Sequence, residues 1–183
     1  MPSFPRAELE EMVRGWLAAN RQCEASGDWR PLAGWYTEDA TYGWNMGPGE
    51  DFMAVGRAEI RDIAVGLEMR GLHGWSDPYQ RVRIDDRQGE VIGLWKQVSG
   101  QLRPDGAAYE VAGIGGSWFR YGGGMLWSWQ RDFFDLGNVA SLFLEMMSAG
   151  VLSDGMKQRL DNAMSGQPQP GHYPRGTAPV PLW

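Results

Sequence analysis

Apolar side chains recur every three or four positions in the first part of the chain, which is the period of an amphipathic helix. This spacing predicts helices over residues 7–25, 29–36 and 56–69. Between the second and third of these, residues 41–46 alternate like a strand, and the Gly-Pro-Gly sequence at 47–49 predicts a loop. The first part of the chain is therefore predicted to hold three helices and one strand.

The pattern changes to alternation in the second part of the chain, which favours strands. Strands are predicted over residues 79–85, 90–99, 108–120 and 125–134. The segments between them are rich in Gly, Pro and Asp, so neighbouring strands should pair as antiparallel hairpins in one long meander. Helical spacing returns over 136–149 and 151–164. The Pro- and Gly-rich tail from residue 167 is predicted to be extended, or disordered until it docks.

Helices followed by a curved antiparallel sheet predict an α+β fold in which the N-terminal helices close one side of the sheet. The sheet then has the shape of a cone with a pocket inside. A length of 183 residues suits one domain, which we expect over residues 1–150. Residues 151–183 are expected to add a C-terminal helix and an extended tail.

The chain is rich in tryptophan, with ten among its 183 residues. Five of them fall in strand-like stretches: Trp44, Trp95, Trp118, Trp127 and Trp129. Because the indole ring is large, flat and mostly apolar, such a cluster on one sheet predicts a cavity for a flat hydrophobic or aromatic ligand. An unusually aromatic core without a ligand is the alternative interpretation of the same residues.

Charge and composition argue against several classes of partner and site. The formal net charge is −6 without a cluster of Lys and Arg, which argues against nucleic acid or an anionic membrane surface. The single cysteine, Cys23, excludes an internal disulfide. No His/carboxylate cluster or Gly-rich phosphate loop is spaced to hold a metal or a nucleotide, so we expect no cofactor. Without a signal-peptide pattern at 1–11 or a long apolar run, we expect a cytoplasmic protein.

Three short motifs accompany this order of elements: Gly27-Asp28-Trp29, Tyr-Thr-Glu-Asp-Ala-Thr at 36–41, and Gly-Arg-Ala-Glu-Ile at 56–60. Together they resemble the nuclear transport factor 2-like superfamily, in the branch of SnoaL, ketosteroid isomerase and scytalone dehydratase. The resemblance covers residues 8–135. It implies a cone-shaped fold with a cavity that serves either acid–base catalysis or, as in the non-enzymatic members, binding alone.

The positions that carry catalysis in ketosteroid isomerase differ in this chain. Asn20 stands where the resemblance implies a tyrosine, Trp44 where it implies the aspartate base, and Ser117 where it implies a second aspartate. These differences argue against a dienol-forming isomerase. Of the two histidines that the resemblance to scytalone dehydratase implies, His73 can match the first, and no residue matches the second.

The candidate site follows from which strand residues share a face, because alternate residues point the same way. Asp132 is predicted to lie in the cavity, where apolar walls raise a carboxyl pKa into a useful acid–base range. An ion pair with Arg131 is the alternative for Asp132. His73 is the second candidate proton carrier, with a structural hydrogen bond as its alternative. His172 is assigned to the tail and excluded from the site.

Hydrogen-bond donors and an aromatic lining complete the predicted site. Asn20 and Tyr42 are expected to polarise a substrate oxygen. Met46 and Ser128 are predicted to face the cavity. The residues expected to bind the substrate are Trp16, Trp44, Tyr109, Ser117, Phe119, Gln130 and Phe134.

These residues suit a cofactor-free lyase, acting by elimination or dehydration, or an isomerase, on a bulky aromatic or polycyclic molecule. A binding protein of the same fold, which holds a hydrophobic ligand without chemistry, is the alternative. On the outer face of the sheet we expect Trp118, Trp127 and Trp129, and such an apolar patch predicts a homodimer through the sheet. The tail over 168–183 is expected to wrap across the partner or to cover the pocket.

Overall fold

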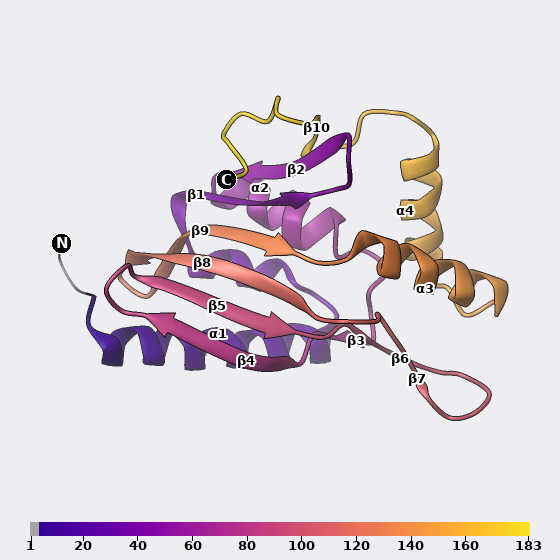
Figure 1. The fold of residues 1–183 in the computed structure, drawn as a ribbon, viewed down its shortest axis with the longest axis horizontal. Coiled ribbons are helices and arrows are strands. Elements are labelled where there is room, and N and C mark those ends of the chain that lie inside the picture. Colours follow the sequence, from indigo (N-terminus) through magenta and orange to yellow (C-terminus); the bar gives the residue numbers. More distant parts are fainter. Residues whose placement is uncertain (1–3) are drawn as a thin grey trace.

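The computed structural model describes residues 4–183, and a seven-stranded sheet dominates it (Figure 1). In the order of the sheet, the strands are His172–Pro174 (β10), Glu50–Val55 (β2), Tyr36–Asn45 (β1), Leu126–Phe133 (β9), Gly115–Gly123 (β8), Glu90–Trp95 (β5) and Tyr79–Asp85 (β4). All neighbouring strands are antiparallel except β1 and β9, which are parallel.

A small sheet and several helices surround the large sheet. The small sheet consists of Trp75–Ser76 (β3), Val98–Leu102 (β6) and Ala108–Glu110 (β7). The helices are Arg6–Ser26 (α1), the 3-10 helix Arg30–Trp35 (η1), Arg57–Glu59 (α2), the π-helix Ile60–Leu67 (η2), Leu136–Ser148 (α3) and Asp154–Met164 (α4). Helix α1 runs across one face of the large sheet, and α3 and α4 lie at one end of it (Figure 1). Within residues 4–183, no helix is both long and apolar enough to cross a membrane.

The predicted α+β architecture is confirmed, and the first helix lies where the apolar spacing predicts it. Leu9, Met12, Trp16 and Cys23 form its buried stripe. The helix ends at Gly27, which adopts a left-handed conformation (φ 71°) and donates its N–H to the carbonyl oxygen of Cys23 at 2.7 Å. The predicted second and third helices also form, as η1 and as α2 continued by η2.

The predicted antiparallel pairings form, as β4 with β5, β5 with β8, and β8 with β9. The departure is that the predicted strands 90–99 and 108–120 each break in two. Their ends, β6 and β7, leave the large sheet and pair with each other in the small one. Two glycines of β8 leave room for aromatic rings of the neighbouring strands. A side chain at Gly115 would collide with the ring of Trp95, and one at Gly116 would collide with Phe133.

Sequence periodicity misses β2 and the first half of β1. Four consecutive residues of β2 are buried, so this strand has no alternation to detect. Strand β1 begins at Tyr36, inside the predicted second helix. Its parallel pairing with β9 sets Tyr42 opposite Gln130 and Trp44 opposite Asp132. This register decides the geometry of the functional site.

Trp16 of α1 lies at the centre of the main core. Its indole ring meets the rings of Tyr36, Phe119 and Trp127 edge-on, with centroids 5.4 to 6.3 Å apart. Phe119 and Trp127 also stack on each other at 4.8 Å. The helix is therefore fixed to the inner face of β1, β8 and β9 by aromatic contacts.

Two expectations about β9 are wrong because the β8–β9 ladder contains an irregularity. Arg120 pairs with Trp129, whereas the next residue, Tyr121, pairs with Trp127. Ser128 is therefore an extra residue, a β-bulge, and the side chain before it points to the face opposite to the one that alternation predicts. Trp127 therefore points into the core and is fully buried, rather than facing outward. Ser128, predicted to face the cavity, instead donates its hydroxyl to the carbonyl oxygen of Arg120 at 3.3 Å.

The tail packs against the sheet, and we call residues 167–183 the C-terminal arm. Its strand β10 pairs with the edge strand β2 (Figure 1). At the end of the arm, Trp183 packs on Trp118 and Trp129 of the outer face, with ring centroids 6.4 Å apart in both pairs. The arm thus meets the outer aromatic patch of its own chain. The homodimer through this face and the domain boundary at residue 150 stay predictions.

Arg131 joins the arm to the sheet. Its guanidinium donates to the carbonyl oxygens of Leu182 at 2.6 Å and Pro181 at 3.1 Å. On the sheet side it donates to both oxygens of Thr41 and to the carbonyl oxygen of Gln130. Burial, with the nearby charge of Arg120, lowers the pKa of Arg131 to about 10, so the group is still charged at neutral pH.

We expect Arg131→Gln to lower the free energy of unfolding by roughly 2 to 4 kcal/mol, because buried carbonyl oxygens lose a charged donor. Arg61→Gln, which removes an exposed ion pair with Asp62, is the control and should cost less than about 1 kcal/mol. Urea denaturation followed by tryptophan fluorescence measures both. Equal losses for the two variants would contradict the role given to Arg131.

Candidate functional site

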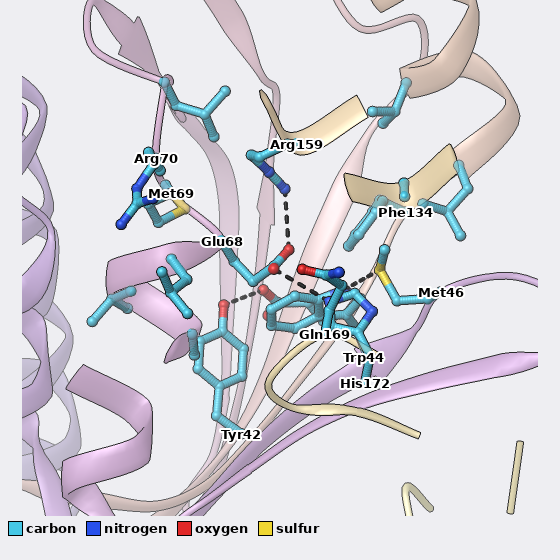
Figure 2. Close-up of a pocket in the computed structure, with 18 of the residues that line it drawn as sticks. Tyr42, Trp44, Met46, Glu68, Met69, Arg70, Phe134, Arg159, Gln169 and His172 are labelled. Atoms are coloured by element: carbon cyan, nitrogen blue, oxygen red, sulfur yellow. Dashed lines mark hydrogen bonds and ion pairs between the residues drawn. The ribbon is translucent and has the colours of Figure 1, made fainter. Parts of the chain in front are cut away.

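One large cavity, of about 760 Å³, lies between the inner face of the sheet and the helices. Residues of α1, η1 and η2 form one wall and the sheet forms the other, while α3, α4 and the C-terminal arm supply further lining (Figures 1 and 2). The polar side chains gathered on this lining include Tyr36, Tyr42, Asp77, Tyr79, Ser117, Gln130 and Asp132.

Asp132 accepts hydrogen bonds at both of its carboxylate oxygens. The hydroxyl of Tyr42 donates to Oδ2 at 2.5 Å, and Nε2 of Gln130 donates to Oδ1 at 2.8 Å. The parallel register of β1 and β9 produces this arrangement, because it sets Tyr42 directly beside Gln130 on the strand that carries Asp132. Both donors stabilise the ionised form of the carboxyl group.

The groups around Asp132 are themselves held in place. Tyr36 donates its hydroxyl to Oε1 of Gln130, which fixes the amide with its nitrogen towards Asp132. The hydroxyl oxygen of Ser117 accepts from Nε2 of Gln130 at 3.4 Å and from the indole nitrogen of Trp95 at 2.9 Å. The result is a connected network that orients the carboxylate.

Asp132 is 8 % exposed, and burial raises its pKa above the ordinary value. Hydrogen bonds from Gln130, Ser117 and Tyr42 act in the opposite direction without cancelling the effect of burial on the pKa. Within the described residues, Asp132 forms no salt bridge, and Arg131 points to the opposite face of the sheet and binds the arm. The alternative of an ion pair between Asp132 and Arg131 is therefore wrong.

A second carboxyl group, Asp77, lines the same cavity. It lies just before β4, and its backbone N–H donates to Oε1 of Glu24 at 2.7 Å. Its Oδ1 is buried and has no hydrogen-bond partner in the described part of the chain. Burial, together with the negative charges of Glu24 and Asp132, raises the pKa of Asp77 to about 8. At neutral pH, Asp77 is therefore mostly protonated.

Aromatic rings make up much of the remaining lining. Trp16 donates its indole N–H to the hydroxyl oxygen of Tyr79 at 3.2 Å. Trp44 stacks on Phe52 with ring centroids 3.8 Å apart, and its indole N–H meets the sulfur of Met46 at 2.8 Å. Such walls exclude water from the two carboxyl groups and suit a flat, mostly apolar molecule.

Most of the predicted site residues come together on this cavity. The structure places on its lining Asp132, Tyr42, Asn20, Trp16, Trp44, Ser117, Gln130 and Phe134, and Met46 as well. The amide of Asn20 is partly occupied, because it donates to the carbonyl oxygen of Trp16 at 2.8 Å. One of its two N–H groups is left for a ligand.

Three predicted residues lie elsewhere. His73 is exposed, and its ring lies against Gly27. Tyr109 belongs to the hairpin that leaves the large sheet, and it is buried in a separate core cluster. Phe119 is stacked on Trp127 in the main core, beneath the cavity wall. His73, Tyr109 and Phe119 do not line the cavity.

Sequence reasoning misses several titratable groups of the cavity, among them Glu50, Glu68, Asp77 and His172. The pairing of β10 with β2 carries His172, excluded as a tail residue, to the cavity, where its ring contacts Glu50 and Glu68. Asp77 lies in a segment without periodicity. The only local feature that could have suggested Asp77 as a site residue is its position directly before a predicted strand. No local pattern shows which strand a tail residue will pair with.

Comparison with known proteins identifies the fold. No family model matches the sequence, and no curated protein matches it closely. A nuclear transport factor 2-like protein from Anabaena variabilis ATCC 29413 is 17 % identical, with a TM-score of 0.53 over 74 % of this chain and 95 % of that one. This chain has the nuclear transport factor 2-like fold. The cone-shaped α+β architecture implied by the sequence motifs is thereby confirmed.

Other structures with the nuclear transport factor 2-like fold are equally distant in sequence. A polyketide cyclase candidate from Xanthomonas campestris pv. campestris is 18 % identical, with a TM-score of 0.51 over 75 % of this chain and 97 % of that one. A protein with a ketosteroid isomerase-like fold from Catenulispora acidiphila, solved with trimethylamine, is 15 % identical, with a TM-score of 0.52 over 72 % and 91 %. At these identities the likeness shows the fold alone.

The raised pKa of Asp77 makes folding stability depend on pH. An unfolded aspartate ionises near about pH 4, whereas folded Asp77 ionises near about pH 8, so between these values the folded state binds the extra proton. The contribution of Asp77 to stability therefore falls as the pH rises through this window. Asp77→Asn removes the effect and should be more stable than the wild type by about 5 kcal/mol at about pH 8, because raising the pKa from about 4 to about 8 corresponds to this free energy, but not at about pH 4.

Urea denaturation at several pH values measures the difference between the wild type and Asp77→Asn. Asp161→Asn, at an exposed position of α4, is the matched control and should leave the pH dependence unchanged. A difference between Asp77→Asn and the wild type that stays constant from about pH 4 to about pH 8 would show that Asp77 is not held protonated.

Proposed function

We propose that this protein is a cofactor-free lyase or isomerase that moves a proton within a bulky aromatic or polycyclic substrate. The observation that carries the proposal is the pair of carboxyl groups, Asp132 and Asp77, on one apolar cavity. Their surroundings favour different protonation states, which is how enzymes separate a general base from a general acid. Elimination of water is the reaction that we favour, since it needs one group in each state.

Asp132 has the role of general base. Its carboxylate is oriented by Tyr42 and Gln130, and its raised pKa makes it a stronger base than an exposed aspartate. It removes a proton from a carbon of the substrate. The electron pair of the broken C–H bond then forms the new double bond. The hydroxyl of Tyr42, whose pKa burial and the charge of Asp132 raise well above the ordinary value, stays a hydrogen-bond donor throughout.

Asp77 has the role of general acid. Because it is mostly protonated at neutral pH, it can donate its proton to the departing hydroxyl oxygen, which then leaves as water. The carbon–oxygen bond breaks as the double bond forms, so the sum of the two steps is a dehydration. In an isomerisation, the same pair removes a proton at one position and returns one at another.

The cavity supports the substrate class. A volume of about 760 Å³ is large enough for a polycyclic molecule, and the ring of Trp44, which stacks on the buried Phe52, offers a flat apolar surface. The similarity of fold to a polyketide cyclase candidate and to ketosteroid isomerase-like proteins fits multi-ring substrates. The second N–H of Asn20 would orient a carbonyl or hydroxyl oxygen within this apolar space. The hydroxyl of Tyr42, expected to share this role, already donates to Asp132.

A binding protein that holds the same kind of ligand without chemistry is the second candidate. One observation favours it: both carboxylate oxygens of Asp132 are already satisfied by donors of the protein. A buried carboxylate that is fully paired can serve structure alone. Turnover separates the two candidates, since binding would be common to both.

We expect Asp132→Asn to reduce turnover by roughly 100-fold to 10,000-fold while keeping the fold, because asparagine occupies the same space but cannot accept the proton. Aromatic and steroidal compounds that quench the cavity tryptophans are incubated in D2O. Mass spectrometry then detects loss of water or uptake of deuterium. His73→Ala, at an exposed position outside the cavity, is the control and should keep full activity.

Loss of activity in Asp132→Asn but not in His73→Ala supports the proposed function. Tight binding without conversion of any compound, in the wild type and both variants, supports the binding protein instead. Full activity of Asp132→Asn would remove Asp132 from the mechanism.

A further inference from the structure

A chain of charged groups holds the beginning of the C-terminal arm at the cavity. Nδ1 of His172 lies 3.3 Å from Oε1 of Glu50, and its Nε2 lies 3.3 Å from Oε1 of Glu68. The other oxygen of Glu68 accepts from Nη2 of Arg159 at 3.1 Å. Figure 2 shows Glu68 between Arg159 and His172. These side chains belong to β10, β2, the residue after η2, and α4, so four segments meet around one imidazole ring.

This part of the arm is a wall of the cavity. Gln169, His172 and Pro174 all line it. The ring of His172 packs edge-on against Phe52 with centroids 5.5 Å apart, and its side chain is only 10 % exposed. Displacing these residues would open the cavity to solvent.

The backbone contacts of this wall are few. Strand β10 has three residues, and beside it Gly171 accepts a hydrogen bond from the N–H of Met53 at 2.8 Å. Gly176 donates its N–H to Oδ2 of Asp51 at 2.9 Å. So short a strand at a sheet edge is only marginally stable by itself. The contacts of His172 with its two carboxylates are therefore a substantial part of what holds the wall closed.

The charges around His172 make these contacts sensitive to pH. Burial acts to lower the pKa of His172, but Glu68 and Glu50 outweigh it and raise the pKa. In Glu68, burial acts to raise the pKa, and His172 and Arg159 outweigh it and lower the pKa. Since the folded pKa of His172 lies above its unfolded value, its stabilising contribution is complete below that unfolded value. It is lost as the pH rises through the folded pKa.

We propose that the beginning of the C-terminal arm, residues 167–176, is a gate to the cavity, latched by protonated His172 between Glu50 and Glu68 and released when His172 loses its proton. A gate of this kind controls the entry and exit of a ligand and the exclusion of water. The inference concerns regulation of the same cavity, and only its effect on turnover rests on the proposed function. A binding protein with this gate would release its ligand faster at higher pH.

Hydrogen–deuterium exchange tests the latch without any ligand. Exchange of residues 167–176 and of the Met53 amide, corrected for the intrinsic pH dependence of exchange, should rise roughly threefold to tenfold from about pH 6 to about pH 9. His172→Gln should exchange at the higher rate at both pH values, because glutamine cannot carry the charge. His73→Gln removes the other histidine of the chain and should behave like the wild type.

Asp77→Asn tests whether the pH dependence comes from the buried carboxyl group of Asp77 rather than from His172. This variant should keep the wild-type pH dependence of exchange in the arm. Exchange in the wild-type arm that does not change with pH would overturn the proposal. The proposal would also be overturned if His172→Gln protected the arm from exchange as well as the wild type does at about pH 6. Because no substrate enters the measurement, its outcome is independent of whether Asp132 supports turnover.

Glu50→Gln provides a second variant should His172→Gln fail to fold. Its side chain is 46 % exposed, so the substitution removes one of the two carboxylates at little cost to the core. Glu50→Gln should raise exchange of the arm at about pH 6 by a smaller factor than His172→Gln, which removes the contacts with both carboxylates. Unchanged exchange in Glu50→Gln would contradict the latch.

Discussion

Moving a carboxyl group out of water costs several kcal/mol unless hydrogen-bond donors replace the water or the group keeps its proton, and the cavity shows both solutions. Asp132 has a donor at each oxygen, Tyr42 on one side and Gln130 on the other. The Oδ1 of Asp77 has no donor, and its pKa is raised to about 8. The two carboxyl groups therefore differ in the hydrogen-bond donors that surround them. From this difference follows the assignment of a base and an acid.

The rest of the fold maintains this difference. The parallel pairing of β1 with β9 brings Tyr42 beside Gln130, although the two residues are far apart in the sequence. Trp16 packs α1 against the sheet and keeps the cavity walls aromatic. The C-terminal arm closes the cavity on one side through His172 and is fixed on the outer face of the sheet through Arg131. The hydrogen bonds of Asp132 therefore depend on the packing of distant parts of the chain.

How much of this could be predicted depends on whether the decisive information is local. Helix α1 and the hairpins have clear periodicity, and alternation from Gln130 to Phe134 places Asp132 in the cavity. Alternation fails where Ser128 adds a residue to β9, which sends Trp127 into the core. The continuously buried strand β2 has no alternation at all. Such irregularities arise from packing between distant segments, which a local pattern does not contain.

The functional site shows the same limit. Gln130 and Asp132 can be predicted together because alternate residues of one strand share a face, whereas His172 reaches the cavity only through the pairing of β10 with β2. The position of His73, before the predicted sheet, favours it as a proton carrier, but its ring lies against Gly27 and does not line the cavity. His172 lines the cavity instead. Only the tertiary pairing distinguishes the two.

The most direct test of the central claim is a ¹³C NMR titration of the aspartate side-chain carboxyl carbons, with Asp77→Asn and Asp132→Asn used for assignment. We expect both groups to titrate above the ordinary aspartate value of about 4, with Asp77 losing its proton at about pH 8. Two groups that both titrate near about pH 4 would contradict it, because neither would then be distinguished from an exposed aspartate.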